Sequence, residues 1–393
     1  MDVAQQSKRR VLIRTLMRTT TPEHLNYGGL LQAWALQQAV RGLGYECATD
    51  ESRPDVPIRP RSRLLARTVV KAAPPALVPM KFARNQLEAE LNERLLRFGL
   101  QNLERVRVFG RDGRLDEDAL DDFDAWVVGS DQVWRSDYGD VLSYLLDFLP
   151  KSFAGPRVAY AASFGSAEPS EESAALSRSA GEAARRLTAV SVREDSGIDV
   201  TRELWGVKAE RVLDPTLLLY PHDYSERLSI ETPEAARGAV VSYVLDPDQR
   251  KRAFTEDLAN GLGLESYQML PPPPRSYAAF VADRERYLRP SVEAWIGAIA
   301  NADCVLTDSF HGCAFAILFS RPFLVVPNHQ RGLARFESLL QLVGLTDRFI
   351  GEGDVSRQMR RPIDWGQVRA SLEADRLRSM EFLGSALNSP SRL

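Results

Sequence analysis

No apolar run in the sequence approaches the roughly 18 residues that a membrane-spanning helix requires. The N-terminus leads through Lys8-Arg9-Arg10 into a predicted strand, a pattern that differs from that of a secretory signal peptide. The three cysteines, Cys47, Cys304 and Cys313, lack the spacing of a disulfide framework or a metal site, so a reducing compartment fits best. We therefore expect a cytoplasmic protein that binds no metal.

An excess of positive charge is also lacking, since the formal net charge is -3 at pH 7. This balance gives no electrostatic reason to expect nucleic-acid binding. Only six of the 50 basic residues are lysines. Arginine binds phosphate and carboxylate groups in a bidentate way. A preference for arginine over lysine is, however, more often genomic than functional. With 393 residues, 44% of them hydrophobic, the chain has the length of two or three soluble domains.

Short apolar, β-prone segments alternate with segments of helical periodicity along most of the chain, which predicts the α/β class with parallel sheets covered by helices. We place an N-terminal Rossmann-like domain at 1–220, a second one at 221–350, and a C-terminal helix that packs back on the first at 351–393. Residues 218–238 read as a crossing linker. The predicted strands are 11–17, 45–49, 124–128, 158–162, 189–192, 211–213, 239–245, 266–270, 304–307 and 322–326.

Residues 54–85 differ in character, because they are rich in proline and arginine. Such a basic amphipathic segment could lie on an anionic membrane surface, which would put the protein at the inner face of the membrane. It could also serve as a mobile lid. The plainer alternative is a solvated insertion at the surface.

The stretch 304–318 reads as a buried strand, a sharp loop and an apolar helix. Asp308 and Ser309 are N-cap residue types, Gly312 permits close backbone approach, and the helix N-terminus suits a phosphate. His311 lies in this loop, where α/β proteins place ligands, and its unperturbed pKa lies near neutrality. The alternative is that Asp308 only caps the helix and that His311 is a hydrogen-bonded loop residue.

Polar side chains also follow three other predicted strands. Asp131 could orient or deprotonate a hydroxyl, while Trp134 offers a flat face for a sugar or, alternatively, is buried in the core. Arg193 at the end of a strand suits an anion, although a surface pair with Glu194 or Asp195 is the alternative. The loop around Gly28-Gly29 could cradle a phosphate or merely let a helix pack close to the sheet.

Six motifs, in their order along residues 11 to about 330, together resemble the polysaccharide pyruvyl transferase family. They are Asn26-Tyr27-Gly28-Gly29-Leu30-Leu31-Gln32-Ala33-Trp34-Ala35-Leu36-Gln37, Gly129-Ser130-Asp131-Gln132-Val133-Trp134, Tyr160-Ala161-Ala162-Ser163-Phe164-Gly165, Ser191-Val192-Arg193-Glu194, Val212-Leu213-Asp214-Pro215-Thr216 and Thr307-Asp308-Ser309-Phe310-His311-Gly312. Each motif is weak alone, and the ordered set is fairly specific.

The resemblance implies a GT-B-like fold with a cleft between two domains, and transfer of a pyruvyl group from phosphoenolpyruvate to two sugar hydroxyls, without a further cofactor. It ties His311 and Arg193 to donor binding and catalysis. Some members carry an arginine where this chain has Ser309, so a missing anion contact would come from Arg321, Arg331 or Arg335.

Together, residues and resemblance give a set of expected roles. His311 and Asp131 are the catalytic candidates, Arg193, Asp308, Ser309 and Gly312 bind the donor, and Asn26, Gln132 and Trp134 form the acceptor side. The acceptor would be a sugar or a lipid-linked oligosaccharide. A nucleotide-sugar glycosyltransferase of the same architecture is the first alternative, and a non-catalytic carbohydrate-binding or assembly protein is the second.

Overall fold

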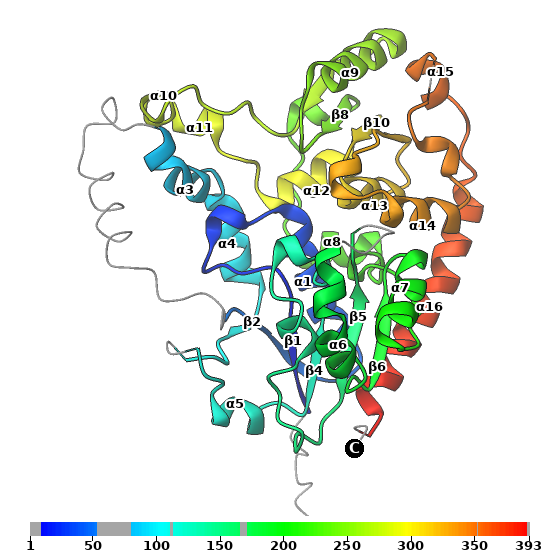
Figure 1. Ribbon diagram of the computed structural model, residues 1–393. Helices are drawn as coiled ribbons and strands as arrows, with labels where there is room; N and C mark the ends of the chain where they lie inside the picture. The colour runs from blue at the N-terminus through cyan, green and yellow to red at the C-terminus, as the bar shows by residue number, and fades with distance from the viewer. Residues whose placement is uncertain (1–8, 53–79, 111–112, 166–170, 352, 391–393) are drawn as a thin grey trace, which may run out of the picture.

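The computed structural model describes residues 9–52, 80–110, 113–165, 171–351 and 353–390 (Figure 1). Most of the predicted basic segment, residues 54–79, therefore lies outside the described residues. Its C-terminal part belongs to helix α3, Met80–Leu91. Among the described residues, no helix is long and apolar enough to cross a membrane.

The N-terminal part of the described chain forms a seven-stranded parallel sheet in the order β3-β2-β1-β4-β5-β6-β7. The chain first runs outward from β1 to β3 and then returns to the other side of β1 to add β4. The carboxyl ends of β1 and β4 are therefore the switch point at which such sheets bind ligands. The strands are β1 (Arg10–Arg14), β2 (Glu46–Asp50), β3 (Arg105–Val106), β4 (Ala125–Val128), β5 (Arg157–Ala162), β6 (Ala189–Val192) and β7 (Glu210–Arg211).

A second parallel sheet has four strands in the order β11-β10-β8-β9. The chain first adds β9 on one side of β8 and then adds β10 on its other side. The carboxyl ends of β8 and β10 are therefore a second switch point. The strands are β8 (Val240–Tyr243), β9 (Ser266–Gln268), β10 (Cys304–Thr307) and β11 (Phe323–Val325). The predicted class, two Rossmann-like units with parallel sheets, is confirmed by these two topologies.

Helices connect the strands and cover both sheets (Figure 1). The predicted linker 218–238 contains a short helix, because Pro221 and the capping residue Asp223 start a turn that buries Tyr224. The remaining helices are α1 (Tyr27–Gly42), α4 (Glu93–Asn102), α5 (Glu117–Asp121), α6 (Glu171–Ala184), α7 (Asp195–Trp205), α8 (Pro221–Arg227), α9 (Gln249–Leu262), α10 (Tyr277–Ala282), α11 (Arg284–Tyr287), α12 (Val292–Ala300), α13 (Phe310–Leu318), α14 (Ala334–Leu342), α15 (Val355–Met359) and α16 (Trp365–Asn388).

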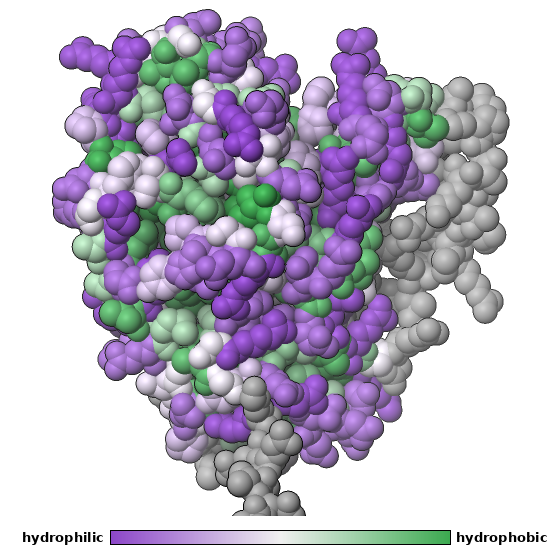
Figure 2. Space-filling view, turned by 180° about the vertical axis from the view of Figure 1, so that it is seen from behind, coloured by the Kyte–Doolittle hydropathy of each residue, from purple (hydrophilic) through white to green (hydrophobic). Residues whose placement is uncertain are grey.

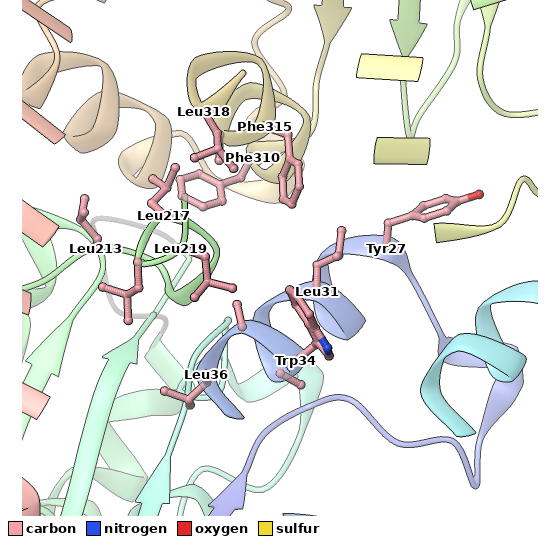
Figure 3. Close-up of a cluster of buried hydrophobic side chains, with 14 of the residues drawn as sticks. Tyr27, Leu31, Trp34, Leu36, Leu213, Leu217, Leu219, Phe310, Phe315 and Leu318 are labelled. Atoms are coloured by element: carbon pink, nitrogen blue, oxygen red, sulfur yellow. The ribbon is translucent and has the colours of Figure 1, made fainter. Parts of the chain in front are cut away.

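One apolar core joins the two units (Figure 3). Leu31 and Trp34 of α1 lie on one side of it, and Phe315 of α13 lies on the other. The ring of Tyr224 bridges them, at 5.3 Å from Trp34 and 5.2 Å from Phe315 between ring centroids. Apolar burial therefore fixes the position of α1 relative to α13. The N-termini of both helices lie at the switch points.

The C-terminal helix α16 packs along the first sheet after the chain has left the second. The Ser379 hydroxyl accepts a hydrogen bond of 2.9 Å from the backbone N–H of Leu213, and the ring of Phe382 lies 6.4 Å from that of Tyr160. The helix thus ties the end of the chain to the unit that contains its beginning.

On the face shown in Figure 2 hydrophilic side chains predominate, and apolar ones form only scattered groups.

Candidate active site between the two sheets

A cavity of about 710 Å³ lies where the two switch points face each other. One wall comes from the segments after β1 and β4, including Arg18 and Asp131. The opposite wall comes from the loop after β10, including His311, and from the first turn of α14, where Arg335 lies. The topology alone thus brings residues more than 150 positions apart in the sequence to one cavity.

The loop after β10 is held by its own polar side chains. The Thr307 hydroxyl accepts from the backbone N–H of Ser309 at 3.0 Å, and Ser309 caps α13 by accepting from the N–H of Gly312 at 3.4 Å. A Cβ on Gly312 would lie 2.4 Å from the Thr307 Oγ1, so only glycine fits against the strand. These contacts place His311 in the first turn of α13, whereas the sequence predicted it in the loop before the helix; the helix begins two residues earlier because Ser309 caps it.

The His311 side chain is wedged between the two units and is 7% exposed. On one side, a Cβ built on Gly28 of α1 would lie only 2.0 Å from the His311 Nδ1. On the other side, the His311 Nε2 lies 3.7 Å from the Asp214 Oδ2, and it has no hydrogen-bond partner among the described residues. Gly28 therefore lets the imidazole approach α1, which favours the close-packing interpretation of that glycine.

Asp214 is the anionic centre of the site. Its Oδ1 accepts from the N–H and the hydroxyl of Thr216, at 3.0 and 2.7 Å, and its Oδ2 accepts from Arg193 Nη1 at 2.5 Å and from the hydroxyl of Ser130 at 3.2 Å. Burial raises the pKa of Asp214, but the neighbouring His311 and Arg193 outweigh it and hold the pKa well below its ordinary value. The group is therefore a fixed carboxylate at neutral pH.

Arg193 does not form the surface pair that was the alternative interpretation. It is buried, its Nη2 lies 3.3 Å from Asp131 Oδ1, and its guanidinium carbon lies 4.6 Å from the centre of the Phe310 ring. Burial lowers the pKa of Arg193, while Asp214, Asp131 and Glu194 more than compensate and raise it. Glu194 itself is used elsewhere, because it accepts from the hydroxyl of Ser163 and from the N–H of Phe164, at 3.0 and 2.8 Å.

Asp131 reaches the cavity with 16% of its side chain exposed. Its backbone has φ 74°, a left-handed conformation that aspartate tolerates better than most residues. Burial raises the pKa of Asp131, but Arg193, His311 and Arg335 together hold it below its ordinary value. Asp131 is thus an ionised carboxylate beside His311 and Arg193, as a role in orienting a hydroxyl requires.

Two of the predicted acceptor residues line the cavity and one does not. Asn26 caps α1 by accepting from the N–H of Gly29 at 2.8 Å, and the Gln132 amide donates across the cavity to the carbonyl of Arg331 at 3.4 Å. Trp134 is instead 4% exposed and packs on Phe164 and Trp205. Trp134 therefore occupies the buried position that was its alternative interpretation, and it presents no face to the cavity.

Asp308 lies at the cavity, but its carboxylate is already saturated. It accepts from the N–H groups of Leu245 and Asp246 at 2.7 and 3.3 Å and forms an ion pair of 2.9 Å with the buried Lys251. Asn328 adds a further hydrogen bond of 3.2 Å. Asp308 thus holds the loops after β8 and β10 together, and the structure gives it no free group for a donor.

Sequence reasoning missed three features of the site. The sequence pattern contains Asp214 only as part of a motif, although its position shortly after the last strand of the first sheet, which ends at Arg211, is a usable signal. The contact between Gly28 and His311 crosses the two units and left no local signal. Tyr138, which is 41% exposed and lines the cavity, belongs to none of the motifs in the sequence.

Of the three arginines considered as replacements at the position of Ser309, two line the cavity, Arg331 and Arg335. Arg321 lies outside it and donates to the carbonyl of Ala302 at 3.4 Å. Within the described part of the chain, no three histidine, cysteine, aspartate or glutamate side chains are grouped so that they could hold a metal ion.

Comparisons with known proteins gave one family. The family model described as "Polysaccharide pyruvyl transferase" matches residues 26–330. No curated protein sequence matches the chain.

Solved structures with a similar overall fold include the UDP-GlcNAc 2-epimerase from Neisseria meningitidis bound to UDP-GlcNAc, with 8% identity and a TM-score of 0.47, covering 96% of this chain and 99% of that one. They also include LpCGTa in complex with UDP, with 12% identity and a TM-score of 0.47, covering 98% of this chain and 100% of that one. At such identities and TM-scores the likeness carries no further conclusion; the two parallel-sheet units and the cavity between them are seen in the structure itself.

Proposed function

Because the chain belongs to the polysaccharide pyruvyl transferase family, we propose that it transfers a pyruvyl group from phosphoenolpyruvate to two hydroxyls of a sugar, forming a cyclic ketal. One observation carries this proposal. His311 from the second unit meets Arg193, Asp131 and Asp214 from the first, at a cavity formed by the switch points of both sheets. This cluster combines an acid–base group, fixed carboxylates and guanidinium groups, which the reaction needs.

The reaction begins with proton transfer to C3 of the enol phosphate, which makes C2 electrophilic. A sugar hydroxyl then attacks C2 and loses its proton, and the C2–O bond to phosphate breaks. The second hydroxyl attacks the same carbon and closes the ring. Each sugar oxygen gives up one proton; C3 gains one, and the other ends on inorganic phosphate, which leaves with the electron pair of the broken bond.

His311 supplies the first proton in this proposal, because imidazole is a suitable general acid near neutral pH. The Asp214 Oδ2 lies 3.7 Å from Nε2 and would face the imidazole from the side of the first unit. Asp131 lines the cavity and lies beside Arg193, which is not among the lining residues, and it can orient an attacking hydroxyl by accepting its hydrogen bond. The N–H of Gly312 is already capped by Ser309, so only the N–H groups of Phe310 and His311, which precede it in the first turn of α13, could contact the anionic donor.

The acceptor would occupy the wall formed by the first unit. Asn26 and Gln132 offer amide groups there, and the exposed ring of Tyr138 provides the apolar face that a sugar can stack on. A sugar of a polysaccharide precursor or of a lipid-linked oligosaccharide fits this assignment. Contact with the inner face of the membrane would involve the basic segment 54–85, most of which lies outside the described residues.

The test is release of phosphate from phosphoenolpyruvate with a panel of glycosides, together with thermal stabilisation by phosphoenolpyruvate. A ligand that binds only the folded protein raises its stability in proportion to saturation. We expect His311→Ala to keep the stabilisation and to lose at least about a hundredfold in turnover, the usual contribution of a general acid. His222→Ala, an exposed histidine of α8 outside the cavity, is the matched control.

Two results would contradict the proposal. Full turnover by His311→Ala would remove the assigned acid. Stabilisation by a nucleotide sugar, with none by phosphoenolpyruvate, would instead favour a glycosyltransferase on the same architecture.

A further inference from the structure

Arg335 is a buried cation that lines the cavity. The residue is 6% exposed and lies in the first turn of α14. Its Nη2 donates to the backbone carbonyl of Arg331 at 2.7 Å, while its Nε is buried without a hydrogen-bond partner among the described residues. No carboxylate of the described chain forms an ion pair with Arg335 within 4 Å.

Three other arginines at the cavity or beside it are neutralised. Arg331 makes two hydrogen bonds to Asp246, of 2.5 and 2.9 Å, and Arg289 pairs with Glu88 at 2.9 Å. Arg193 lies between Asp214 and Asp131. Arg18, which also lines the cavity, places its Nε and Nη2 on two neutral oxygens, the Ser52 carbonyl and the Tyr144 hydroxyl.

The surroundings make the charge of Arg335 costly. Its guanidinium carbon lies 5.6 Å from the centre of the Phe310 ring, and the guanidinium of Arg193 lies over the same ring. Burial and the charge of Arg193 lower the pKa of Arg335 to about 10, although Asp131, Glu194 and Tyr138 act in the opposite direction. Burying a cation without a paired anion costs a large desolvation free energy. Binding of an anion beside it would offset this cost.

We propose that Arg335 is the residue that binds the phosphate group of the donor, and that Arg193 serves to hold Asp131 and Asp214 in place beside it. The unpaired guanidinium faces the cavity that also holds His311, so an anion there would lie next to the proposed acid. Phosphate is the chemistry that this site selects, because a guanidinium and a nearby helix N-terminus both favour it. Which molecule carries the phosphate depends on the proposed function, whereas the anion site itself does not.

The test measures thermal stabilisation by inorganic phosphate, by phosphoenolpyruvate and by UDP, for the wild type and for Arg335→Met. We expect the wild type to be stabilised, and the half-saturating concentration to rise at least about tenfold in Arg335→Met, because a charge-assisted hydrogen bond is worth more than 1.4 kcal/mol. Without ligand, Arg335→Met should melt at a higher temperature than the wild type. A residue with a purely structural role would give a lower melting temperature.

Arg321→Met is the matched control. Arg321 also donates to one backbone carbonyl and has a buried Nε without a partner, but it does not line the cavity. Its response to phosphate should equal that of the wild type. If Arg335→Met folds poorly, Arg335→Gln keeps a polar side chain of similar reach and gives the same comparison.

The inference is overturned if phosphate does not stabilise the wild type, or if Arg335→Met and Arg335→Gln respond to phosphate within about twofold of the wild type. The two proposals fail separately. Stabilisation of the wild type by phosphate and UDP, lost in Arg335→Met and absent with phosphoenolpyruvate, would retain the anion site and reject pyruvyl transfer.

Discussion

Replacing Gly28 by alanine tests the packing of His311 directly. The three atoms nearest to the new Cβ would all belong to the imidazole, at 2.0, 2.5 and 2.7 Å, whereas an ordinary contact begins at 3.4 Å. The ring would have to move by about 1.4 Å, and overpacking of this kind costs about 1–3 kcal/mol. Alanine regains at most about 1 kcal/mol in return through its higher helix propensity.

A double-mutant cycle with His311→Ala isolates this contact. In the His311→Ala protein the clash is gone, so Gly28→Ala should be neutral or stabilise by up to about 1 kcal/mol. The coupling free energy between the two sites should then be about 1–3 kcal/mol. Urea unfolding of the four proteins measures it without any assumption about the substrate.

Gly29→Ala is the control within the same helix, because its Cβ would lie 3.4 Å from the side chain of Asn26, an ordinary contact. We expect Gly29→Ala to have the same effect with and without His311. In turnover, Gly28→Ala should lose about a hundredfold, the cost of misplacing a catalytic group by about 1 Å. A coupling below about 0.5 kcal/mol, the usual error of additivity, would refute the packing argument.

Three other substitutions give clear expectations. Asp214→Asn leaves the buried Arg193 with only Asp131 and should cost about 3–5 kcal/mol at pH 7. Because the pKa of Asp214 is lowered in the folded protein, its contribution is fully present above the unfolded pKa of about 4 and is lost as the pH falls below it. The unfolding free energy of the wild type should therefore fall more steeply than that of Asp214→Asn between about pH 5 and pH 3, and parallel curves would contradict this. Tyr138→Ala should raise the KM for the glycoside about two- to tenfold with little change in kcat. Trp134→Phe should leave that KM unchanged, because Trp134 lies in the core and its indole N–H donates to the carbonyl of Tyr144; the opposite pattern would restore Trp134 to the acceptor side.

The sequence was sufficient to predict which loops after the strands carry the chemistry. Several strands were predicted too long, because those expected to end at 17, 245 and 270 end at Arg14, Tyr243 and Gln268. The ranges predicted for β6 and β10 agree with the structure residue by residue. Since parallel strands end at one edge of a sheet, Arg193 and Asp131 were predictable as neighbours at one edge of the first sheet. That His311 of the second sheet acts at the same site was implied by the family resemblance.

The direction of side chains was not predictable in the same way. Trp134 and Asp308 lie in the expected loops. However, the side chain of Trp134 is buried in the core, and the carboxylate of Asp308 forms an ion pair with Lys251. Whether a polar residue is free or already paired depends on contacts between distant segments, such as that of Arg193 with Asp214. Local patterns carry no information on these pairings, and for this reason the unpaired state of Arg335 emerges only from the structure.

The shared apolar core has a consequence for protein engineering. Because α1 and α13 bury their apolar faces against each other, neither unit has a complete surface of its own. A chimera that exchanges only the second unit for that of another protein would have to preserve the shape of Leu31, Trp34 and Phe315 at the junction. Substrate preferences of this chain are therefore better changed by substitutions within the cavity than by swapping halves.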